Sequence, residues 1–388
     1  MTALPLSGIR VVEMSHMVMG PSCGMILAQL GAEVIKVEPP TGDNTRKLRG
    51  MATAFFPLFN RGKRSLILDL KSEAGRAALE RLLATADVFI ENFRDETIAK
   101  SGLDSKALAQ RFPTLIVGAH KGYLSGPYEH RPALDEVVQM ATGLAYMTGS
   151  RETPLRVGSS INDIMGGMFG VIGILAALIE RQKTRRGKEI RVGLFENCLF
   201  TVAQHMVQYQ ITGVPAAPMP QRSQSWPVYD IFDTADARRV FVAIVTETNW
   251  TALCNNFALK ELLSDPTLQS TPDRIEARPR ILPLIRERFG GLALADLERL
   301  LDALSIPFAP INAPEEMFDD PHVQRPGGLV DMVNVDGRTV RAPALPLEFD
   351  RIGLVNPTVV PVLGADTDAI LNELGLTPGA ARAAPGSS

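Results

Sequence analysis

Short apolar segments rich in branched residues alternate with segments of helical apolar spacing through the first half of the chain. The short segments predict strands at 9–14, 33–38, 66–70, 87–92, 115–118 and 189–194. Helices are predicted between them at 20–30, 73–84 and 105–111, and later at 164–179 and 195–209. Strands that alternate with helices favour a mostly parallel sheet covered on both faces. The sequence therefore predicts an α/β fold with a Rossmann-like layout.

Residues 213–227 interrupt this alternation. Prolines stand at 215, 218, 220 and 227, and each disfavours helical geometry in the residue before it. We interpret the segment as a linker. Beyond it the pattern predicts a hairpin and then helices, which together form a smaller α+β unit. The hairpin pairs 228–232 with 239–245, and the helices lie near 247–257, 274–289 and 293–304.

The last part of the chain predicts a second hairpin, in which 329–335 pairs with 339–342. Asp336-Gly337 supplies a dipeptide that favours the tight turn between them. Residues 377–388 are rich in Ala, Gly, Pro and Ser. We expect this C-terminal tail to be frayed.

Composition narrows the class of protein. The 388 residues are 45% hydrophobic and 21% charged, and the formal net charge is −3. These values are typical of a globular protein of about two domains and give no indication of nucleic-acid binding. The uncharged stretch Ile164–Ile179 is shorter than the roughly 20 residues of a membrane span. We therefore expect a buried core helix there and no membrane contact.

Cysteine and histidine usage exclude several kinds of site. The three cysteines are isolated, with no CxxC pair, which argues against a disulfide framework or a zinc site. No histidine is spaced as a metal-ligand pair. The N-terminal residues lack a basic region followed by an apolar core, so we expect no secretory signal and a cytoplasmic protein.

Asp163 stands directly before the predicted helix 164–179, which carries glycines at 166, 167, 170 and 173. Each glycine costs a helix about 1 kcal/mol relative to alanine. Close approach of another backbone or of a bulky ligand would explain them. The acid has two interpretations at this point. It is an N-cap of the helix, or it is a functional carboxylate beside the positive end of the helix dipole.

Other polar residues gather in loops after predicted strands, where α/β sheets bind ligands. These are His16, Asn92, Arg94, Lys121 and Tyr123, with Lys63 and Arg64 before the next strand. Each alone is explained as a turn-former or a solvated side chain. Together they would place cations near a polyphosphate and a carboxylate near a reactive carbonyl. The glycine fingerprint of nicotinamide-binding sheets is missing after the first strand, which disfavours a dinucleotide-dependent oxidoreductase.

Ordered motifs along almost the whole chain resemble one family. They are Leu6-Ser-Gly-Ile-Arg-Val-Val-Glu, Gly20-Pro21, Leu30-Gly-Ala-Glu-Val-Ile-Lys-Val-Glu-Pro-Pro, Asn60-Arg-Gly-Lys-Arg-Ser, Ala86-Asp-Val-Phe-Ile-Glu-Asn-Phe, Lys121-Gly-Tyr with Gly126-Pro127, Thr184-Arg-Arg-Gly-Lys, Ile306-Pro-Phe-Ala-Pro-Ile-Asn and Leu363-Gly-Ala-Asp-Thr-Asp. In this order they are similar to the class III CoA-transferases. That group includes formyl-CoA and carnitine CoA-transferases and the α-methylacyl-CoA racemases.

The resemblance implies a fold. A large Rossmann-like domain would be built from both chain ends, with a smaller α+β middle domain, and two subunits would form an interlocked homodimer. Its parts are 1–212 in the large domain, the linker 213–227, the small domain 228–325, and 326–388 as the return to the large domain and the tail.

The resemblance also implies a chemistry. Asp163 matches the aspartate that attacks the acyl-CoA thioester, forming an aspartyl anhydride and then an aspartyl-CoA thioester. A carboxylate suits this role because it is already ionised and leaves readily from its anhydride. Coenzyme A enters as acyl-CoA substrate, with a small carboxylic acid as acceptor and no permanently bound cofactor. The matching CoA-binding positions are His16, Met17, Val18, Met19, Lys63, Arg64, Asn92, Phe93, Lys121 and Tyr123.

Two departures from the family pattern matter. No glycine-rich lid loop of the formyl-CoA transferase type lies between Gly213 and Val228. The racemases place a histidine before the aspartate that corresponds to Asp135, and Leu134 stands there instead. A racemase would then lack half of its acid–base pair, so transfer is favoured over racemisation. A catalytically silent CoA-binding paralogue is a further alternative.

The sequence does not identify the donor or the acceptor acid. Arg46, Arg49 and Arg131 lie in stretches that could reach a distal carboxylate, which would suit a dicarboxylic substrate such as succinate. They are equally well explained as surface arginines.

Overall fold

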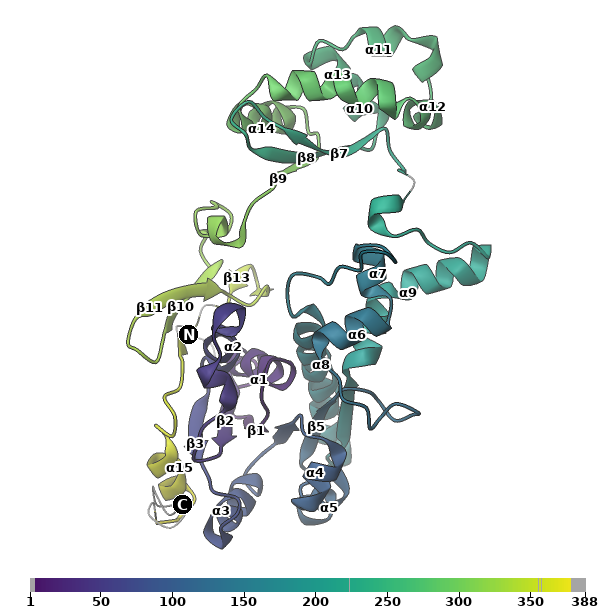
Figure 1. Ribbon diagram of the computed structural model, residues 1–388. Coiled ribbons are helices and arrows are strands. Elements are labelled where there is room, and N and C mark those ends of the chain that lie inside the picture. The colour runs from purple at the N-terminus through teal and green to yellow at the C-terminus, as the bar shows by residue number, and fades with distance from the viewer. Residues whose placement is uncertain (1–3, 223, 355, 357, 378–388) are drawn as a thin grey trace. The chain divides into compact units, whose positions relative to one another are not determined.

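The computed structural model describes residues 4–222, 224–354, 356 and 358–377. It divides the chain into two compact units (Figure 1). The large unit is Met1–Pro220 with Pro321–Ser388, and the small unit is Gln221–Asp320. The large unit thus takes residues from both ends of the chain.

A six-stranded sheet forms the centre of the large unit. Its strands are β1 (Arg10–Met14), β2 (Glu33–Glu38), β3 (Arg64–Ile67), β4 (Val88–Glu91), β5 (Ile116–Lys121) and β6 (Glu189–Gly193). Their order is β3-β2-β1-β4-β5-β6, and every neighbouring pair is parallel. This is the strand order of doubly wound dinucleotide-binding sheets. The predicted α/β fold with a parallel sheet is confirmed.

Helices cover both faces of this sheet, because successive strand residues point to opposite sides. Val11 packs with α1 (Met19–Gln29) and α8 (Ile161–Thr184) on one face. Val12 packs with α3 (Glu73–Leu83), α5 (Ser105–Arg111) and α15 (Thr367–Glu373) on the other. Since α15 comes from the C-terminal segment, the last described residues complete the core that the first ones begin (Figure 1).

The glycines of α8 allow unusually close packing. A Cβ at Gly167 would lie 2.0 Å from Ser22 Oγ and 2.9 Å from the backbone nitrogen of Cys23, both on α1. A Cβ at Gly170 would lie 2.4 Å from His120 Nε2 at the end of β5. The interpretation that these glycines admit a neighbouring backbone is therefore confirmed for the α1–α8 contact.

Several predicted elements differ from the observed ones. The third strand is Arg64–Ile67 rather than 66–70, because β2 pairs with it only over that range. The helix that follows β6 is α9 (Leu194–Thr212), so it starts earlier and ends later than predicted. Short helices of the large unit that the pattern did not predict are α2 (Phe55–Asn60), α4 (Asp95–Lys100), α6 (Asp135–Ala141), α7 (Leu144–Thr148) and α15.

The small unit contains the predicted hairpin as β7 (Val228–Asp233) and β8 (Arg239–Ile244), to which β9 (Phe308–Pro310) adds a third antiparallel strand. Its helices are α10 (Glu247–Asn256), α11 (Glu261–Ser264), α12 (Thr271–Glu276), α13 (Arg278–Gly290) and α14 (Leu294–Ala303). The single helix predicted at 274–289 is wrong. Pro279 lies in the first turn of α13, where a missing N–H is tolerated, so the chain starts a new helix there.

The C-terminal segment of the large unit carries the second predicted hairpin as β10 (Leu329–Val333) and β11 (Thr339–Pro343). The turn places Gly337 at a φ of +81°, which favours glycine. Strand β14 (Thr358–Val359) pairs in parallel with β10, and β12 (Glu348–Phe349) pairs with β13 (Ile352–Gly353). Most of the predicted frayed tail, 378–388, lies outside the described residues.

Helix α8 is long and apolar enough to cross a membrane by length and composition alone, and 39% of that apolar window is buried inside the chain. It was predicted as a core helix of 16 residues, yet it runs from Ile161 to Thr184. Its buried side packs on α1, β5 and β6. The expectation of no membrane contact stays a prediction.

Candidate active site

The strand order places a crevice between the ends of β1 and β4. In doubly wound sheets, ligands bind beyond the strand ends where the strand order reverses. Here the loops after the two strands are joined by a reciprocal pair of hydrogen bonds. The His16 backbone N–H donates to Asn92 Oδ1 at 3.1 Å, and Asn92 Nδ2 donates to the His16 carbonyl at 2.7 Å. Two predicted site residues therefore meet at the switch point.

A cavity of about 450 Å³ opens beside this pair, a size typical of small-molecule sites. Its lining contains four of the predicted CoA-binding residues: His16, Asn92, Phe93 and Lys121. The remaining lining residues are Arg94, Asp95, Glu96, Thr97, His120, Gly122, Glu129, His130, Arg131, Pro132 and Ala133. Asp163, Lys63, Arg64 and Tyr123 do not line it.

The cations around the cavity are of two kinds. Lys121 Nζ lies 2.7 Å from Glu91 Oε1 and 2.9 Å from Asp95 Oδ1, so its charge is already balanced. Burial raises the pKa of Glu91 above its ordinary value, with Lys121 opposing the shift. Arg94 and Arg131 are exposed at the cavity, and neither forms an ion pair within the described chain. These two can accept an anionic ligand.

The other predicted arginines lie elsewhere. The Arg46 guanidinium lies 2.7 Å from Glu38 Oε1 and 3.8 Å from the centre of the Phe56 ring. Arg49 is exposed outside the cavity lining. Arg131 is the member of this set that lines the cavity, with its guanidinium 3.8 Å from the Tyr128 ring centre.

Lys63 and Arg64 are committed to contacts within the protein. The Lys63 ammonium is fully buried and lies 2.6 Å from Glu13 Oε2. Arg64 pairs with Glu33 and Glu373 at the opposite, N-terminal end of the strands. Both geometries argue against the predicted phosphate-binding role, because neither cation faces the cavity. Lys63 precedes β3 and reaches into the protein, whereas Arg64, the first residue of β3, lies at the far end of the strands.

The remaining predicted positions differ in their exposure. Met17 is exposed and has a φ of 64°, whereas Val18 is fully buried. The Met19 side chain fills the space over Gly166, where a Cβ would lie 2.4 Å from its terminal methyl. Tyr123 is buried against Tyr128 and Phe195, with ring centres 5.9 and 5.2 Å away. Met17 is thus the apolar side chain of this loop that a ligand can reach.

Asp163 lies in the first turn of α8, which begins at Ile161 after Ser160. The prediction that it stands directly before the helix, and could be its N-cap, is wrong. Asp135 on α6 takes the capping role instead. Its Oδ2 accepts from the backbone N–H of Asn162 at 3.0 Å and of Asp163 at 3.2 Å. The Asp163 carboxylate itself has no hydrogen bond or ion pair to any residue that the structure describes.

The electrostatic setting of Asp163 is unfavourable to its charge. Burial, followed by the negative charges of Asp135 and Glu136, raises its pKa to about 7. Sequence reasoning expected a carboxylate already ionised, whereas this environment favours the protonated form more strongly than water does. A carboxylate of higher pKa is a stronger nucleophile once ionised. The half-buried side chain remains accessible from solvent.

Helix α6 anchors the segment that leads into α8. Glu136 forms an ion pair with Arg156, and Gln139 Oε1 accepts from the Val157 backbone N–H at 2.8 Å. The Gln139 amide also donates to Asp135, which holds the capping carboxylate in place. Sequence reasoning missed this helix, although the spacing of Asp135 and Gln139 by four residues gave a signal for side chains on one helical face.

Comparisons with known proteins now identify the family. A model of CoA-transferase family III matches residues 6–367. The chain belongs to this family. The prediction of a class III CoA-transferase is thereby confirmed at the level of the family.

Curated relatives and solved structures agree with this result. A succinate–glutarate CoA-transferase of Agrobacterium fabrum is 32% identical over 95% of this chain and 96% of its own length. A succinyl-CoA–D-citramalate CoA-transferase of Chloroflexus aurantiacus is 31% identical over 82% of this chain and 81% of its own. A CAIB/BAIF family protein from Brucella suis has a TM-score of 0.84 with 31% identity, covering 96% of this chain and 100% of that one.

The described residues contain no cluster of metal-ligating side chains. Within 4–222, 224–354, 356 and 358–377, no three His, Cys, Asp or Glu side chains are grouped so that they could hold a metal ion. The described cysteines Cys23, Cys198 and Cys254 are free and buried.

Proposed function

We propose that this member of CoA-transferase family III moves CoA from an acyl-CoA to a free carboxylic acid with Asp163 as the nucleophile. The observation that carries the proposal is that the two acids at the start of α8 have different contacts. Asp135 accepts the helix N–H groups, while the Asp163 carboxylate has no partner among the residues that the structure describes. A structural acid would take those N–H groups itself.

The proposed reaction has four bond exchanges at one carboxylate. An Asp163 oxygen attacks the thioester carbonyl, the C–S bond breaks, and CoA leaves as a thiolate. The thiolate attacks the Asp163 carbonyl of the mixed anhydride and releases the donor acid. The acceptor carboxylate then attacks the aspartyl thioester and frees CoA again. Attack of that thiolate on the acceptor's acyl carbon restores the Asp163 carboxylate and forms the new acyl-CoA.

We assign the CoA to the cavity at the β1–β4 crevice. His16, Asn92 and Phe93 line it together with Arg94 and Arg131, which form no ion pair with the described part of the chain. Arginine recognises phosphate and carboxylate groups through paired N–H donors. The apolar Met17 and the Phe93 ring offer contacts for the uncharged parts of the cofactor.

A dicarboxylic donor or acceptor is the substrate class we propose. Relatives of 32% and 31% identity are named for succinate–glutarate and for succinyl-CoA–D-citramalate transfer. Each of those names contains a dicarboxylic acid. An arginine at the cavity, with Arg131 as the first candidate, would bind the carboxylate that does not react.

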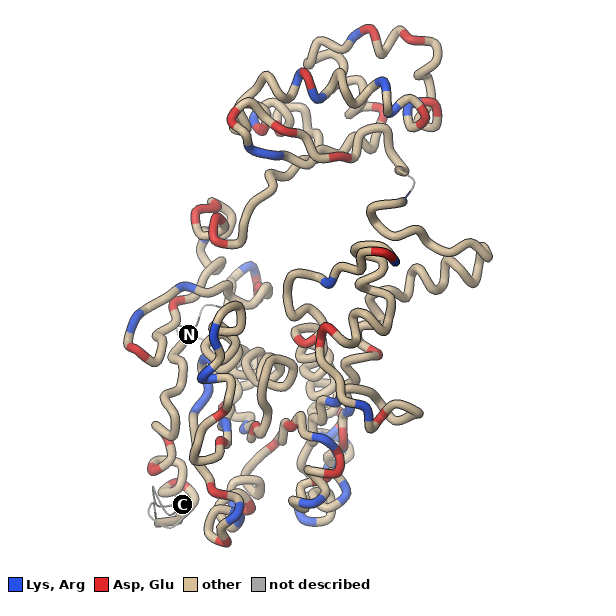
Figure 2. Tube along the Cα trace, viewed as in Figure 1, with Lys and Arg blue, Asp and Glu red and all other residues tan. Residues whose placement is uncertain are grey.

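We also propose a homodimer with interlocked subunits. Helix α9 carries one acidic residue and neither Lys nor Arg, and most of it is drawn in tan in Figure 2. Exposed apolar side chains on it and on α8 are Met168, Ile172, Ile179, Phe200, Met206, Val207, Tyr209 and Ile211. Many exposed apolar side chains on two packed helices are typical of subunit interfaces. Light scattering coupled to size exclusion would measure the mass in solution, and a monomer would contradict the proposal.

The deciding experiment is an acceptor panel. The purified protein is incubated with succinyl-CoA and separately with glutarate, malate, citramalate, oxalate or acetate, and new CoA esters are followed by mass spectrometry. We expect one or more dicarboxylates to be converted and acetate to react poorly. Deuterium incorporation at an α-carbon without transfer would favour the racemase alternative. CoA binding without turnover of any acid would favour a silent paralogue.

A further inference from the structure

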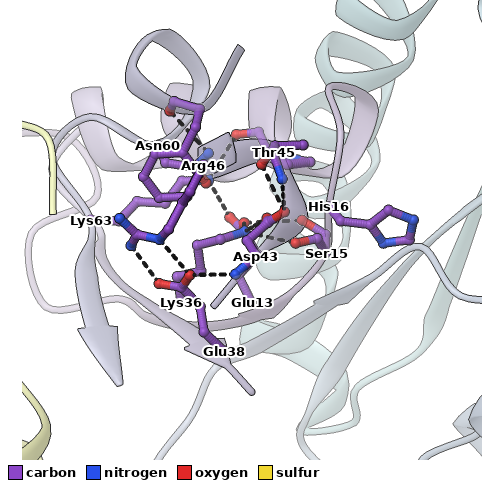
Figure 3. Close-up of polar contacts among 12 residues, drawn as sticks. Glu13, Ser15, His16, Lys36, Glu38, Asp43, Thr45, Arg46, Asn60 and Lys63 are labelled. Carbon is purple, nitrogen blue, oxygen red and sulfur yellow. Dashed lines mark hydrogen bonds and ion pairs between the residues drawn. The ribbon is translucent and has the colours of Figure 1, made fainter. Parts of the chain in front are cut away.

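A buried cluster of charges lies directly beneath the loop that follows β1. Its members are Glu13, Lys36, Glu38, Asp43, Arg46 and Lys63 (Figure 3). Three acids face three bases. The side chains of Glu13, Lys36 and Lys63 are at most 1% exposed. We call this group the β1 cluster.

Glu13 is the link between its two lysines. Lys36 Nζ lies 3.4 Å from Glu13 Oε1, and Lys63 Nζ lies 2.6 Å from Glu13 Oε2. Asp43 balances the second charge, at 3.0 Å from Lys36 Nζ. A Cβ at Gly24 would lie 1.8 Å from Glu13 Oε2. The absence of a side chain at position 24 therefore leaves the space in which the carboxylate reaches Lys63.

Each lysine also holds one end of the loop. Lys36 Nζ donates to the Ser15 carbonyl at 2.7 Å, where the loop begins. Lys63 Nζ donates to the Pro21 carbonyl at 3.0 Å, where α1 has taken over. Ser15 Oγ donates to Glu13 Oε1 at 3.0 Å. The carboxylate thus joins the two attachment points of the segment Ser15–Pro21.

The backbone between these two points is conformationally restricted. Met17 holds a φ of 64°, a conformation that non-glycine residues rarely adopt. A Cβ at Gly20 would lie 2.5 Å from the Ser15 Cβ, so the two ends of the loop are in close contact. The exposed His16 ring points away from the β1 cluster in Figure 3, and His16 lines the cavity. The cluster therefore fixes the backbone, while the cavity side of the loop stays open.

Stability alone does not account for such a cluster. Buried ion pairs lose their hydration, and apolar side chains of similar size often stabilise a fold equally well or better. Their best-attested use is to specify one geometry among several. The geometry specified here is that of the loop that carries His16, which lines the cavity, and the exposed Met17.

We propose that Glu13 is a positioning residue for acyl-CoA binding, which acts by joining Lys36 and Lys63 and so fixing the loop Ser15–Pro21. The inference rests on the proposed function only in taking CoA as the ligand of the cavity. It predicts that loss of Glu13 weakens CoA binding more than it slows the bond exchanges at Asp163.

The test compares Glu13→Gln with Glu33→Gln. Both are the same chemical change, and each acid contacts two cations, since Glu33 pairs with Arg10 and Arg64 on the two neighbouring strands. Glu33 lies at the other end of the strands and its side chain is 33% exposed. Calorimetric titration with free CoA should show a dissociation constant raised about tenfold or more in Glu13→Gln and unchanged in Glu33→Gln. KM for succinyl-CoA should rise in parallel, with kcat changed less than threefold.

A second variant separates positioning from folding. Glu13→Met with Lys63→Met removes the deepest pair as a unit and leaves Lys36 with Asp43 as its partner. We expect this double variant to keep a cooperative thermal transition and still to bind CoA about tenfold more weakly. Unchanged affinity in a folded variant, or failure of both variants to fold, would overturn the proposal. Wild-type protein that transfers CoA while the variants bind it normally would refute the positioning role alone. Wild-type protein that binds no CoA would refute the proposed function as well.

Discussion

The β1 cluster and the start of α8 differ in whether their buried acids are paired with bases. Under the first loop, three acids meet three bases within hydrogen-bonding distance. At the start of α8, Asp163 lies near Asp135 and Glu136, and no base among the described residues pairs with it. The balanced region holds a backbone in place. The unbalanced one raises the pKa of an acid, as functional carboxylates often require.

The two regions are also joined. Helix α1 begins where the β1 cluster ends, and it packs against α8 through the contact of Ser22 with Gly167. Ser22 Oγ donates to the Met19 carbonyl at 2.9 Å and lies 3.5 Å from the Asp163 carbonyl. A charge-balanced scaffold therefore supports the helical turn that carries Asp163, the proposed nucleophile. Substitutions in the two regions and at the contact between them test this difference.

The largest effect is expected at Asp163. Asp163→Asn keeps the shape and removes the nucleophile, so transfer should fall by roughly 10³-fold or more. The folded-state pKa of about 7 lies above the ordinary value of 3.8, so ionisation of this group lowers stability as pH rises through that interval. The variant should therefore melt no lower than wild type at pH 8 and equally at pH 4. Retained turnover would remove Asp163 from the mechanism.

The next effect concerns the joint between the regions. In Gly167→Ala, the new methyl would meet Ser22 Oγ, the Cys23 backbone nitrogen and the Met19 carbonyl at 2.0, 2.9 and 3.0 Å. Backbone atoms cannot move aside cheaply, so we expect a loss of about 1–3 kcal/mol in the free energy of unfolding. Gly158→Ala in the preceding loop is the matched control, because no atom lies within 4 Å of its Cβ. Denaturant titration of both variants would show whether the α1–α8 contact is as tight as the distances indicate.

A smaller effect should appear in the pH profile. Protonated Asp163 cannot attack, so kcat/KM should fall about tenfold per pH unit below the pKa of about 7. Asp135→Asn removes a neighbouring negative charge and leaves a side-chain oxygen to accept the helix N–H groups. The pKa of Asp163 should drop, and the acid limb should move to lower pH. Glu136→Gln should move it less, because Glu136 is the weaker cause. An unmoved limb in both variants would assign it to another group.

The sequence predicted the balanced region poorly and the sheet well. The parallel sheet was predictable because its strands are buried on both faces. Such strands are short apolar runs that alternate with helices, and this pattern is visible in the local sequence. Lys63 was expected to meet phosphates, since a sequence does not tell a buried lysine from a surface one until a partner such as Glu13 is placed beside it. Asp163 was identified through resemblance, yet its place inside the helix depended on Asp135, 28 residues away in the chain. Contacts of that kind arise only from tertiary packing.

The smallest effect is expected at Arg64, which directly follows Lys63 in the chain but faces partners of a different kind. Its guanidinium pairs with Glu33 and Glu373, and the three side chains are 26%, 33% and 42% exposed. Water screens such pairs, so Arg64→Met should cost at most about 1 kcal/mol, and less at high salt. KM for succinyl-CoA should stay the same, because the far edge of the sheet does not contact the cavity. A several-fold rise in KM would instead return Arg64 to the CoA-binding set. It would also mean that a cation at the N-terminal end of the strands acts on the ligand, although the cavity lies at the other end.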